Sequence, residues 1–329
     1  MNTAVISYRV RLARNLRSLP FPGVMSAEQR MELIDKLSSL MTKAGFSATV
    51  LDGNTSNTAR SMVEAHLISP EFAGESAPHA VLLSHDRKIS VMVCEEDHLR
   101  IQAFGDDPAV CLTEARRVEA LIDEQMPLAF DERLGYLTAC PTNLGTGLRV
   151  SALLHLPGLT ESGAIRSIIA QAQQAGLAVR GFYGEGTQAA WGYYQVSNAV
   201  TMGLGEEELV SGLADVVRQL SSAEKNSRQA ILRRDPIGLA DKVWRAAGIL
   251  KSARRISTHE AMEALSQLRV GISLGILPCG GDIDLLSQKI WPGHLLEANP
   301  GLADEASRDE ARAALLRGSL DIGKDGVFE

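Results

Sequence analysis

Residues 140–149, with the sequence Cys-Pro-Thr-Asn-Leu-Gly-Thr-Gly-Leu-Arg, form the stretch around which this 329-residue chain is organised. Apolar, strand-like segments flank it at 136–139 and 150–156, which predicts a strand, a tight polar loop and a second strand. Glycine lets backbone N–H groups approach a bound anion, and Arg149 offers a planar cation that suits phosphate. A glycine turn with an arginine beside it by chance fits the same residues, because short motifs give false positives.

The composition narrows the class of protein. Hydrophobic residues make up 45% and charged residues 22%, as in soluble globular proteins. We expect no membrane association, because no apolar run approaches ~20 residues and the N-terminus lacks a secretory signal. A net charge of −7 argues against direct nucleic-acid binding. The four cysteines, Cys94, Cys111, Cys140 and Cys279, match no zinc or disulfide spacing, which predicts a reducing, cytoplasmic location.

A first basic segment lies near the N-terminus. Residues 5–12 alternate as in a β-strand, which places Ser7, Arg9 and Arg11 on one face. Two arginines and a hydroxyl on one strand face could hold a polyphosphate. A charged, solvated edge strand is the alternative.

A dense group of titratable residues follows a predicted hairpin. Residues 80–84 and 88–93 are β-rich runs, and the second leads into Cys-Glu-Glu-Asp-His-Leu-Arg at 94–100. Loops at strand ends often carry functional groups, although a solvated acidic turn fits as well. These residue types could bind a metal, but no separate cluster completes a site, so we predict none held by the protein. A similar strand and glycine loop at 177–187 carries Arg180 and Glu185.

Helical patterns separate these segments and then dominate. A capping box at 26–29 precedes apolar spacing typical of a helix, and strand signals fade beyond about residue 228. Residues 272–277 suggest a packed module for self-association. His66 is expected to be structural. Arg308 and Arg312 share a helix face, as in an ordinary salt-bridged surface helix. The predicted helices cover 31–43, 108–126, 160–176, 205–234, 237–250, 258–270 and 307–318.

The arginine-bearing segments suggest one chemistry if they converge. An anion site lined by arginines and faced by Glu96 and Glu185 suits phosphoryl transfer from a nucleotide to a cationic acceptor. The sequence contains neither a Walker A motif nor the motifs of ordinary protein kinases. The arginines concerned are Arg9, Arg11, Arg100, Arg149 and Arg180.

These stretches, in this order, resemble the signature motifs of the ATP:guanido phosphotransferases over most of residues 4–227. Three features are similar to the bacterial protein-arginine kinases within that family. Arg9 falls almost at the start, with no large helical domain before it. Residues 180–186 read Arg-Gly-Phe-Tyr-Gly-Glu-Gly, and residues 308–313 read Arg-Asp-Glu-Ala-Arg-Ala.

The resemblance implies an α+β fold with two domains. Residues 4–227 would form a catalytic domain with an antiparallel β-sheet flanked by helices. Residues 228–329 would form a small all-helical domain for dimerisation and phosphoarginine sensing, so a homodimer is expected.

The resemblance also implies roles for particular residues. The catalytic residues would be Glu96, Glu185 and Cys140. Mg²⁺ would be held mainly through the nucleotide phosphates. ATP would be bound by Ser7, Tyr8, Arg9, Val10, Arg11, His66, Arg100, Arg149, Val150, Ser151, Ala152, Leu153, Arg180, Gly181, Phe182, Tyr183, Gly184 and Glu185. An allosteric phosphoarginine pocket would use Arg308, Asp309, Arg312 and Ala313.

The implied function is transfer of the ATP γ-phosphoryl group to exposed arginine side chains of proteins. In this group the modification directs proteins to a Clp unfoldase-protease and inactivates a heat-shock repressor, and a zinc-binding activator protein is a further implied partner. One alternative is a kinase for free arginine or another small guanidine. Another is a phosphoarginine-binding adaptor that has lost activity.

Two positions depart from the usual pattern of the family. Cys94 stands where asparagine is common, and residues 150–153 read Val-Ser-Ala-Leu instead of Ala-Ser-Val-Met. Neither change removes a charged group that the chemistry needs.

Overall fold

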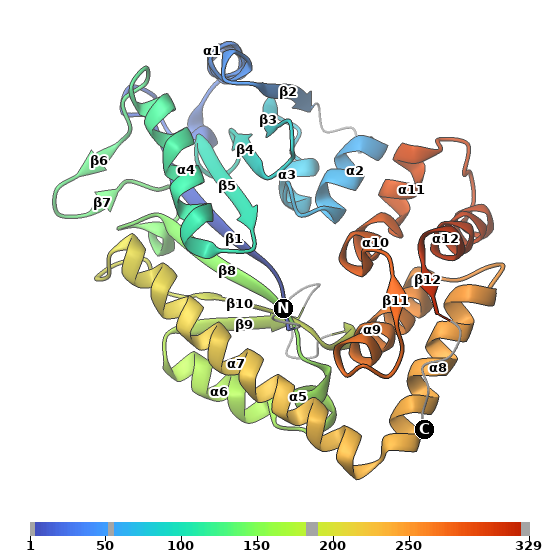
Figure 1. Ribbon diagram of the computed structural model, residues 1–329. Helices are drawn as coiled ribbons and strands as arrows, with labels where there is room; N and C mark the ends of the chain where they lie inside the picture. Colours follow the sequence, from blue (N-terminus) through green and yellow to red (C-terminus); the bar gives the residue numbers. More distant parts are fainter. Residues whose placement is uncertain (1–3, 52–55, 182–189, 324–329) are drawn as a thin grey trace.

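A large antiparallel sheet organises the first two thirds of the chain. The computed structural model describes residues 4–51, 56–181 and 190–323. Within these ranges, eight strands form one sheet in the order β2-β3-β4-β5-β1-β8-β10-β9 (Figure 1). They are β1 (Val5–Arg14), β2 (Phe46–Leu51), β3 (His79–Ser84), β4 (Ile89–Val93), β5 (Leu99–Gly105), β8 (Leu148–His155), β9 (Leu177–Gly181) and β10 (Tyr193–Asn198).

The N-terminal basic strand is central. β1 pairs with β5 on one side and with β8 on the other. The predicted strand is therefore confirmed, and the edge-strand alternative is wrong. The predicted hairpin is also present, since β3 pairs antiparallel with β4.

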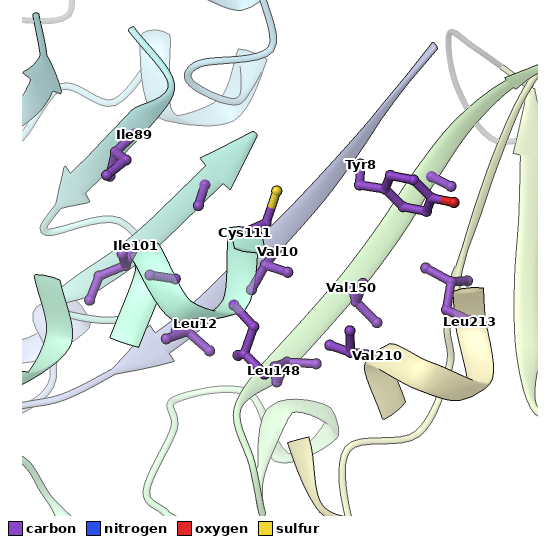
Figure 2. Close-up of a cluster of buried hydrophobic side chains, with 14 of the residues drawn as sticks. Tyr8, Val10, Leu12, Ile89, Ile101, Cys111, Leu148, Val150, Val210 and Leu213 are labelled. Carbon is purple, nitrogen blue, oxygen red and sulfur yellow. The ribbon is translucent and has the colours of Figure 1, made fainter. Parts of the chain in front are cut away.

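One face of the sheet packs into the main apolar core. Tyr8, Val10 and Leu12 point to the same side as Leu148 and Val150, and all five are buried. Figure 2 shows these side chains packed with Val210 and Leu213 of α7 (Glu206–Arg234) and with Cys111 of α4 (Pro108–Asp123). Alternation along each strand leaves the odd-numbered residues of β1 and β8 on the opposite face.

Helices cover both faces. α1 follows the predicted capping box, in which Ser26 and Gln29 satisfy each other's backbone N–H groups. α1, α4, α6 and α7 pack on the core face, while α2 and α3 cover the opposite face near β2–β4. The helices of this domain are α1 (Ala27–Lys43), α2 (Asn57–Glu64), α3 (Pro70–Ala73), α4 (Pro108–Asp123), α5 (Pro157–Glu161), α6 (Ile165–Gln174) and α7 (Glu206–Arg234).

Short elements complete this domain. A small ribbon pairs β6 (Phe130–Asp131) with β7 (Gly135–Tyr136). Three 3₁₀ turns cover Pro22–Val24, Pro141–Asn143 and Ala190–Gly192.

The C-terminal third is a helical unit with its own core. Its helices are α8 (Pro236–Ser252), α9 (Thr258–Ser273), α10 (Ile283–Lys289), α11 (Pro292–Ala298) and α12 (Glu305–Ser319). It also contains a two-stranded ribbon, β11 (Cys279–Gly280) with β12 (Asp321–Ile322). The predicted all-helical domain is therefore helical except for this ribbon. Ile276 and Leu277, predicted to serve self-association, are buried in this core.

The predicted boundary at residue 228 falls inside α7, which runs unbroken to Arg234. The helix ends at Asp235, which caps α8 ahead of Pro236. Arg228 is buried and pairs with Glu224, whose carboxylate accepts hydrogen bonds from the N–H groups of Gly158 and Leu159 at 2.9 Å. Pro236 locates the break between the helices better than the loss of strand-like sequence does, because α7 packs against both domains.

A second junction joins the two domains at α2 and α11, which lie side by side in Figure 1. The buried carboxylate of Glu64 accepts hydrogen bonds from the N–H groups of Gly293 (2.8 Å) and His294 (3.0 Å) and contacts the His294 ring. A Cβ atom at position 293 would lie 2.7 Å from Glu64 Oε2. This contact holds α11, and with it the preceding α10, beside the face of the sheet opposite the core.

Among the described residues, no helix is both long and apolar enough to cross a membrane.

Candidate active site

The predicted arginines converge on the face of the sheet opposite the core. β-Register places Arg11 directly opposite Arg149, Arg9 opposite Ser151, and Ala13 opposite Arg100. Directly opposed residues of antiparallel strands project to the same side. Arg180 joins them through β10, because it lies opposite Gln195, which lies opposite Leu153. Five arginines from four separate stretches therefore share one face, hereafter the arginine face.

This cluster carries uncompensated positive charge. Burial and the charges of Arg100 and Arg149 lower the pKa of Arg9 to about 10. Burial, followed by Arg9, Arg149 and Arg100, lowers the pKa of Arg11 well below its ordinary value. Burial and the charges of Arg180 and Arg100 lower the pKa of Arg149. Nε of Arg11 and of Arg149 is buried without a hydrogen-bond partner among the described residues. Such a site suits a polyanion that would supply the missing countercharge.

Residues 94–100 contribute one buried and one exposed glutamate to the arginine face. Glu95 is largely buried, pairs with Arg100 at 2.7 Å and accepts a hydrogen bond from Ser69 at 2.9 Å. Burial raises the pKa of Glu95, although Arg100 opposes that shift. The predicted Glu96 has a side chain that is 45% exposed and lies 3.7 Å from Arg100. Two carboxylates thus reach the edge of the arginine face. Glu95 was not among the predicted site residues, although it is adjacent to Glu96.

Two other residues of that run are structural. Asp97 is buried and accepts hydrogen bonds from Asn15 and from the N–H group of Ala139. His98 is buried, accepts a hydrogen bond from the N–H group of Leu16 and contacts the carbonyl of Pro20 at 2.9 Å. Part of the density of titratable groups in this run therefore comes from residues that anchor the scaffold.

The glycines of residues 140–149 serve backbone packing. Gly147 has φ +56°, and a Cβ there would lie 2.7 Å from the Ala13 carbonyl oxygen. Gly145 has φ +99°, and a Cβ there would lie 2.5 Å from the Thr201 carbonyl oxygen. The N–H group of Thr146 donates to that same carbonyl at 3.0 Å. These close chain crossings explain both glycines without a bound anion, as the alternative of a glycine turn expects.

Cys140 lies at the start of the 3₁₀ turn Pro141–Asn143 and is partly exposed. Its Sγ contacts Thr142 Oγ1 at 3.0 Å. Thr201 fixes this turn by donating to the carbonyls of Thr142 and Leu144. The thiol is therefore accessible and held on an anchored segment.

His66 belongs to the site rather than to the scaffold alone. It follows α2 with φ +58°, and burial and the charge of Arg9 lower its pKa to about 4. The adjacent Leu67 carbonyl accepts hydrogen bonds from Ser90 and Gln102, both at 2.8 Å. Ser90 and Gln102 were not predicted. They are polar residues on the same face of β4 and β5, and only the pairing of those strands reveals their role.

A cavity of about 400 Å³ extends the arginine face toward the C-terminal helices. Its wall includes Ser7, Arg9, His66, Ser151 and Leu153, all predicted to bind ATP. The anion site and this cavity share Arg9. A phosphate-bearing ligand could therefore extend from one into the other.

Four predicted ATP-binding residues need correction. The side chains of Tyr8, Val10, Val150 and Ala152 are buried on the core face, and the backbone of β1 and β8 is paired on both sides. The strand period of two separates them from their neighbours on the arginine face. Gly181, the last residue of β9, is buried. Phe182, Tyr183, Gly184 and Glu185 lie outside the described residues.

The predicted phosphoarginine residues lie on α12. Arg312 is buried and donates to the carbonyls of Ile290 and Ile256, both at 2.7 Å, and pairs with Asp309. Ala313 is buried, and Arg308 is partly buried beside the Leu302 carbonyl. The expected surface pair is corrected for Arg312, which connects three segments of the helical domain.

The structure explains why asparagine suits position 94. Cys94 adopts φ +62°. Asparagine tolerates this left-handed conformation better than most residues. The cysteine is buried, and burial raises its pKa to about 11.

Two family comparisons cover most of the chain. The family described as "ATP:guanido phosphotransferase, C-terminal catalytic domain" matches residues 28–227. The family described as "Protein-arginine kinase McsB C-terminal domain" matches residues 236–327. Its first residue is the proline that begins α8.

Full-length relatives agree with these matches. A protein-arginine kinase of Halalkalibacterium halodurans is 40% identical over 327 residues, which covers 97% of this chain and 92% of the relative. A protein-arginine kinase of Caldanaerobacter subterraneus subsp. tengcongensis is 39% identical over 328 residues, which covers 96% and 97%.

Solved structures agree on the fold. A duplicated taurocyamine kinase from Schistosoma mansoni with bound transition-state-analogue components matches with a TM-score of 0.59 and 27% identity, over 69% of this chain and 34% of that one. A lombricine kinase matches with a TM-score of 0.58 and 26% identity, over 68% of this chain and 67% of that one. The chain belongs to the ATP:guanido phosphotransferase family, and within it to the protein-arginine kinases.

Proposed function

We propose that this protein transfers the γ-phosphoryl group of ATP to arginine side chains of other proteins. The observation that carries the proposal is the arginine face, where Nε of the buried Arg11 and of Arg149 has no hydrogen-bond partner among the described residues. Three phosphates of a nucleotide would supply the countercharge. The protein-arginine kinases that resemble this chain along nearly their whole length support a protein acceptor.

The chemistry assigns separate tasks to the two ends of the site. Arg9, Arg11 and Arg149 would bind the phosphates and stabilise charge on the transferring group. A guanidinium nitrogen of the acceptor attacks the γ-phosphorus, the bond from that phosphorus to the bridging oxygen breaks, and ADP leaves. Glu96 would take the proton released from the guanidinium. Free arginine titrates above ~12, so proton removal must accompany transfer.

Positioning residues support this step. Glu95 holds Arg100 in place through its 2.7 Å ion pair. Cys140 would orient the acceptor from its anchored turn, and Glu185 would act with Glu96 as the resemblance implies.

Magnesium fits the site as a partner of the nucleotide. We expect Mg²⁺ to be held mainly through the nucleotide phosphates, as the resemblance implies. When bound with ATP, Mg²⁺ would neutralise phosphate charge.

Family membership also supports a cellular role. We propose that the protein acts in the cytoplasm as a homodimer during stress. The modified proteins would be passed to a Clp protease, and a heat-shock repressor would be one substrate. A zinc-binding activator would enhance activity, and the Arg308–Asp309 region of α12 would sense phosphoarginine.

The direct test uses three reactions with ATP and Mg²⁺: a basic protein, free arginine, and neither. We expect acid-labile phosphate on the protein and none on free arginine. Product on free arginine alone would contradict the protein acceptor. Phosphoarginine binding without transfer to either acceptor would indicate an adaptor.

A further inference from the structure

The cavity beside Arg9 has one wall that belongs to the C-terminal helical domain. Leu285, Gln288 and Lys289 of α10 line it, together with His294 of α11. We infer that α10 forms the outer wall of the nucleoside subsite, with Leu285 as the apolar contact for the base. The inference rests on the proposed use of ATP and assigns a nucleotide-binding role to the C-terminal domain.

The cavity is continuous with the arginine face. Arg9 lines the cavity and is also close enough to Arg100 and Arg149 for their charges to lower its pKa. A triphosphate on the arginines would therefore place the rest of the nucleotide toward one of two sides. Glu95 and Glu96 border the Arg100 side and would repel a nucleotide there. The cavity is the remaining direction.

The walls of the cavity combine apolar and polar groups. Leu67, Phe104 and Leu153 supply apolar surface from the catalytic domain, and Leu285 faces them from α10. Polar groups of Ser7, Ser151 and Gln195 lie along the sheet side. Apolar walls with a few polar groups are typical of sites that take a small organic ligand. The volume of about 400 Å³ lies within the ~300–1,000 Å³ of such sites.

The pattern of α10 itself also fits a wall of this cavity. Ile283 and Leu286 are buried in the core of the helical domain, as expected for a short amphipathic helix. Leu285 is 43% exposed on the side that lines the cavity. A leucine at that position adds nothing to the domain core. An apolar ligand face in the cavity explains its presence.

The helix α10 is held in place. Arg269 of α9 pairs with Asp284 of α10, and Glu64 of α2 binds the backbone of Gly293 and His294. The wall is therefore fixed to both domains. A preformed wall reduces the entropy lost when the ligand binds.

The test compares Leu285→Ala with Ile237→Ala, a matched change at an 82% exposed position on α8. Equilibrium binding is measured for ATP and for inorganic tripolyphosphate, with the full-length protein. We expect Leu285→Ala to weaken ATP binding about three- to tenfold, because it removes apolar contact with the base. Tripolyphosphate binding should not change, and Ile237→Ala should change neither.

Two further variants guard against a folding defect. Leu285→Met preserves apolar volume and should retain ATP affinity, whereas the polar Leu285→Gln should lose it while binding tripolyphosphate normally. Unchanged ATP affinity in both Leu285→Ala and Leu285→Gln would overturn the inference. Equal loss of ATP and tripolyphosphate binding would overturn it as well.

Binding does not depend on the acceptor, so the two proposals can fail separately. A protein that shows the Leu285 effect but phosphorylates only free arginine supports the nucleoside wall and contradicts the protein acceptor. A protein that phosphorylates proteins but binds ATP equally well after Leu285→Ala contradicts the wall alone.

Discussion

At the scale of single residues, the buried charges of the arginine face lower the stability of the empty protein and favour the binding of phosphates. Burial and the charges of Arg9, Arg149 and Arg100 lower the pKa of Arg11. Among the described residues, Glu95 opposes that shift. A charge in this position is unfavourable in the empty protein and becomes favourable when phosphates bind.

Arg11→Met tests both effects directly, because methionine keeps the apolar stem and removes the charge. We expect phosphoryl transfer to fall about 10²–10³-fold, as for loss of one group that stabilises the transition state. The free energy of unfolding without ligand should stay the same or rise by ~1 kcal/mol. Urea unfolding and initial rates measure both. A variant that is less stable and fully active would contradict the assignment.

Glu96 should act in chemistry with little effect on folding. Glu96→Gln is expected to lower kcat about 10²–10⁴-fold, the usual contribution of a general base. Its stability should change by under ~1 kcal/mol, since the side chain is 45% exposed. The matched control is Glu114→Gln on α4, with a side chain that is 43% exposed. Equal kcat values in the two variants would exclude Glu96 as the base.

At the scale of elements, residues 140–149 show what a sequence can and cannot specify. The motif locates Arg149 and Cys140, but glycine permits both anion binding and close chain crossing. The contacts that decide between them come from Ala13 and Thr201, which are far away in the sequence. Alternation along β1 predicted the arginines correctly. It also implied that Tyr8 and Val10 face the other way, which the range-based ATP assignment ignored.

Gly147→Ala should therefore destabilise the fold. The left-handed conformation costs ~1–2 kcal/mol for alanine, and the added Cβ would contact backbone at 2.7 Å. Gly163 has φ +76° and nothing within 4 Å, so Gly163→Ala isolates the conformational part. Chemical denaturation should show a larger loss for Gly147→Ala by ~1–3 kcal/mol. Equal losses would show that the crossing tolerates a side chain.

The α2–α11 junction makes a second prediction at this scale. Glu64→Ala leaves the backbone N–H groups of Gly293 and His294 without their acceptor, and should cost ~1–3 kcal/mol. Arg60→Ala removes only the 52% exposed partner of Glu64 and should cost under ~1 kcal/mol. Urea unfolding compares the two. A larger effect of Arg60→Ala would contradict the role given to Glu64.

At the scale of the whole molecule, sequence motifs predicted the antiparallel sheet and the arginines that its register brings to one face. They missed the junctions, because Glu64, Glu224 and Arg228 belong to no motif and acquire their roles only when distant helices meet. Arg312 shows the converse. Its spacing suggested an ordinary salt-bridged surface helix, but packing of α12 directs its guanidinium to the Ile290 and Ile256 carbonyls.

The lowered pKa values of the buried histidines predict how the free energy of unfolding varies with pH. Burial lowers the pKa of His66 to about 4, and it also lowers the pKa values of His98 and His155. The unfolded chain binds protons on these imidazoles near pH 6.5, whereas the folded protein binds them only at lower pH. Stability should therefore fall as pH decreases from 7.5 to 5.5. Each histidine contributes at most ~1.4 kcal/mol per pH unit.

His155→Gln provides the check on this pH effect. Urea unfolding across that range should show a smaller slope for the variant, because one proton-binding difference is removed. An unchanged slope would show that His155 does not contribute. Stability that rises on acidification in the wild type would reject the sign of the effect.

The central claim is that the site forms a phosphorus–nitrogen bond on an arginine side chain of a protein. Phosphorus NMR of a basic substrate protein, after incubation with ATP and Mg²⁺ and removal of nucleotide, tests it most directly. We expect a phosphoramidate resonance that disappears in acid and is absent when Arg11→Met replaces the wild-type enzyme. A phosphate-ester resonance from serine, threonine or tyrosine, or no protein-bound phosphorus, would contradict it.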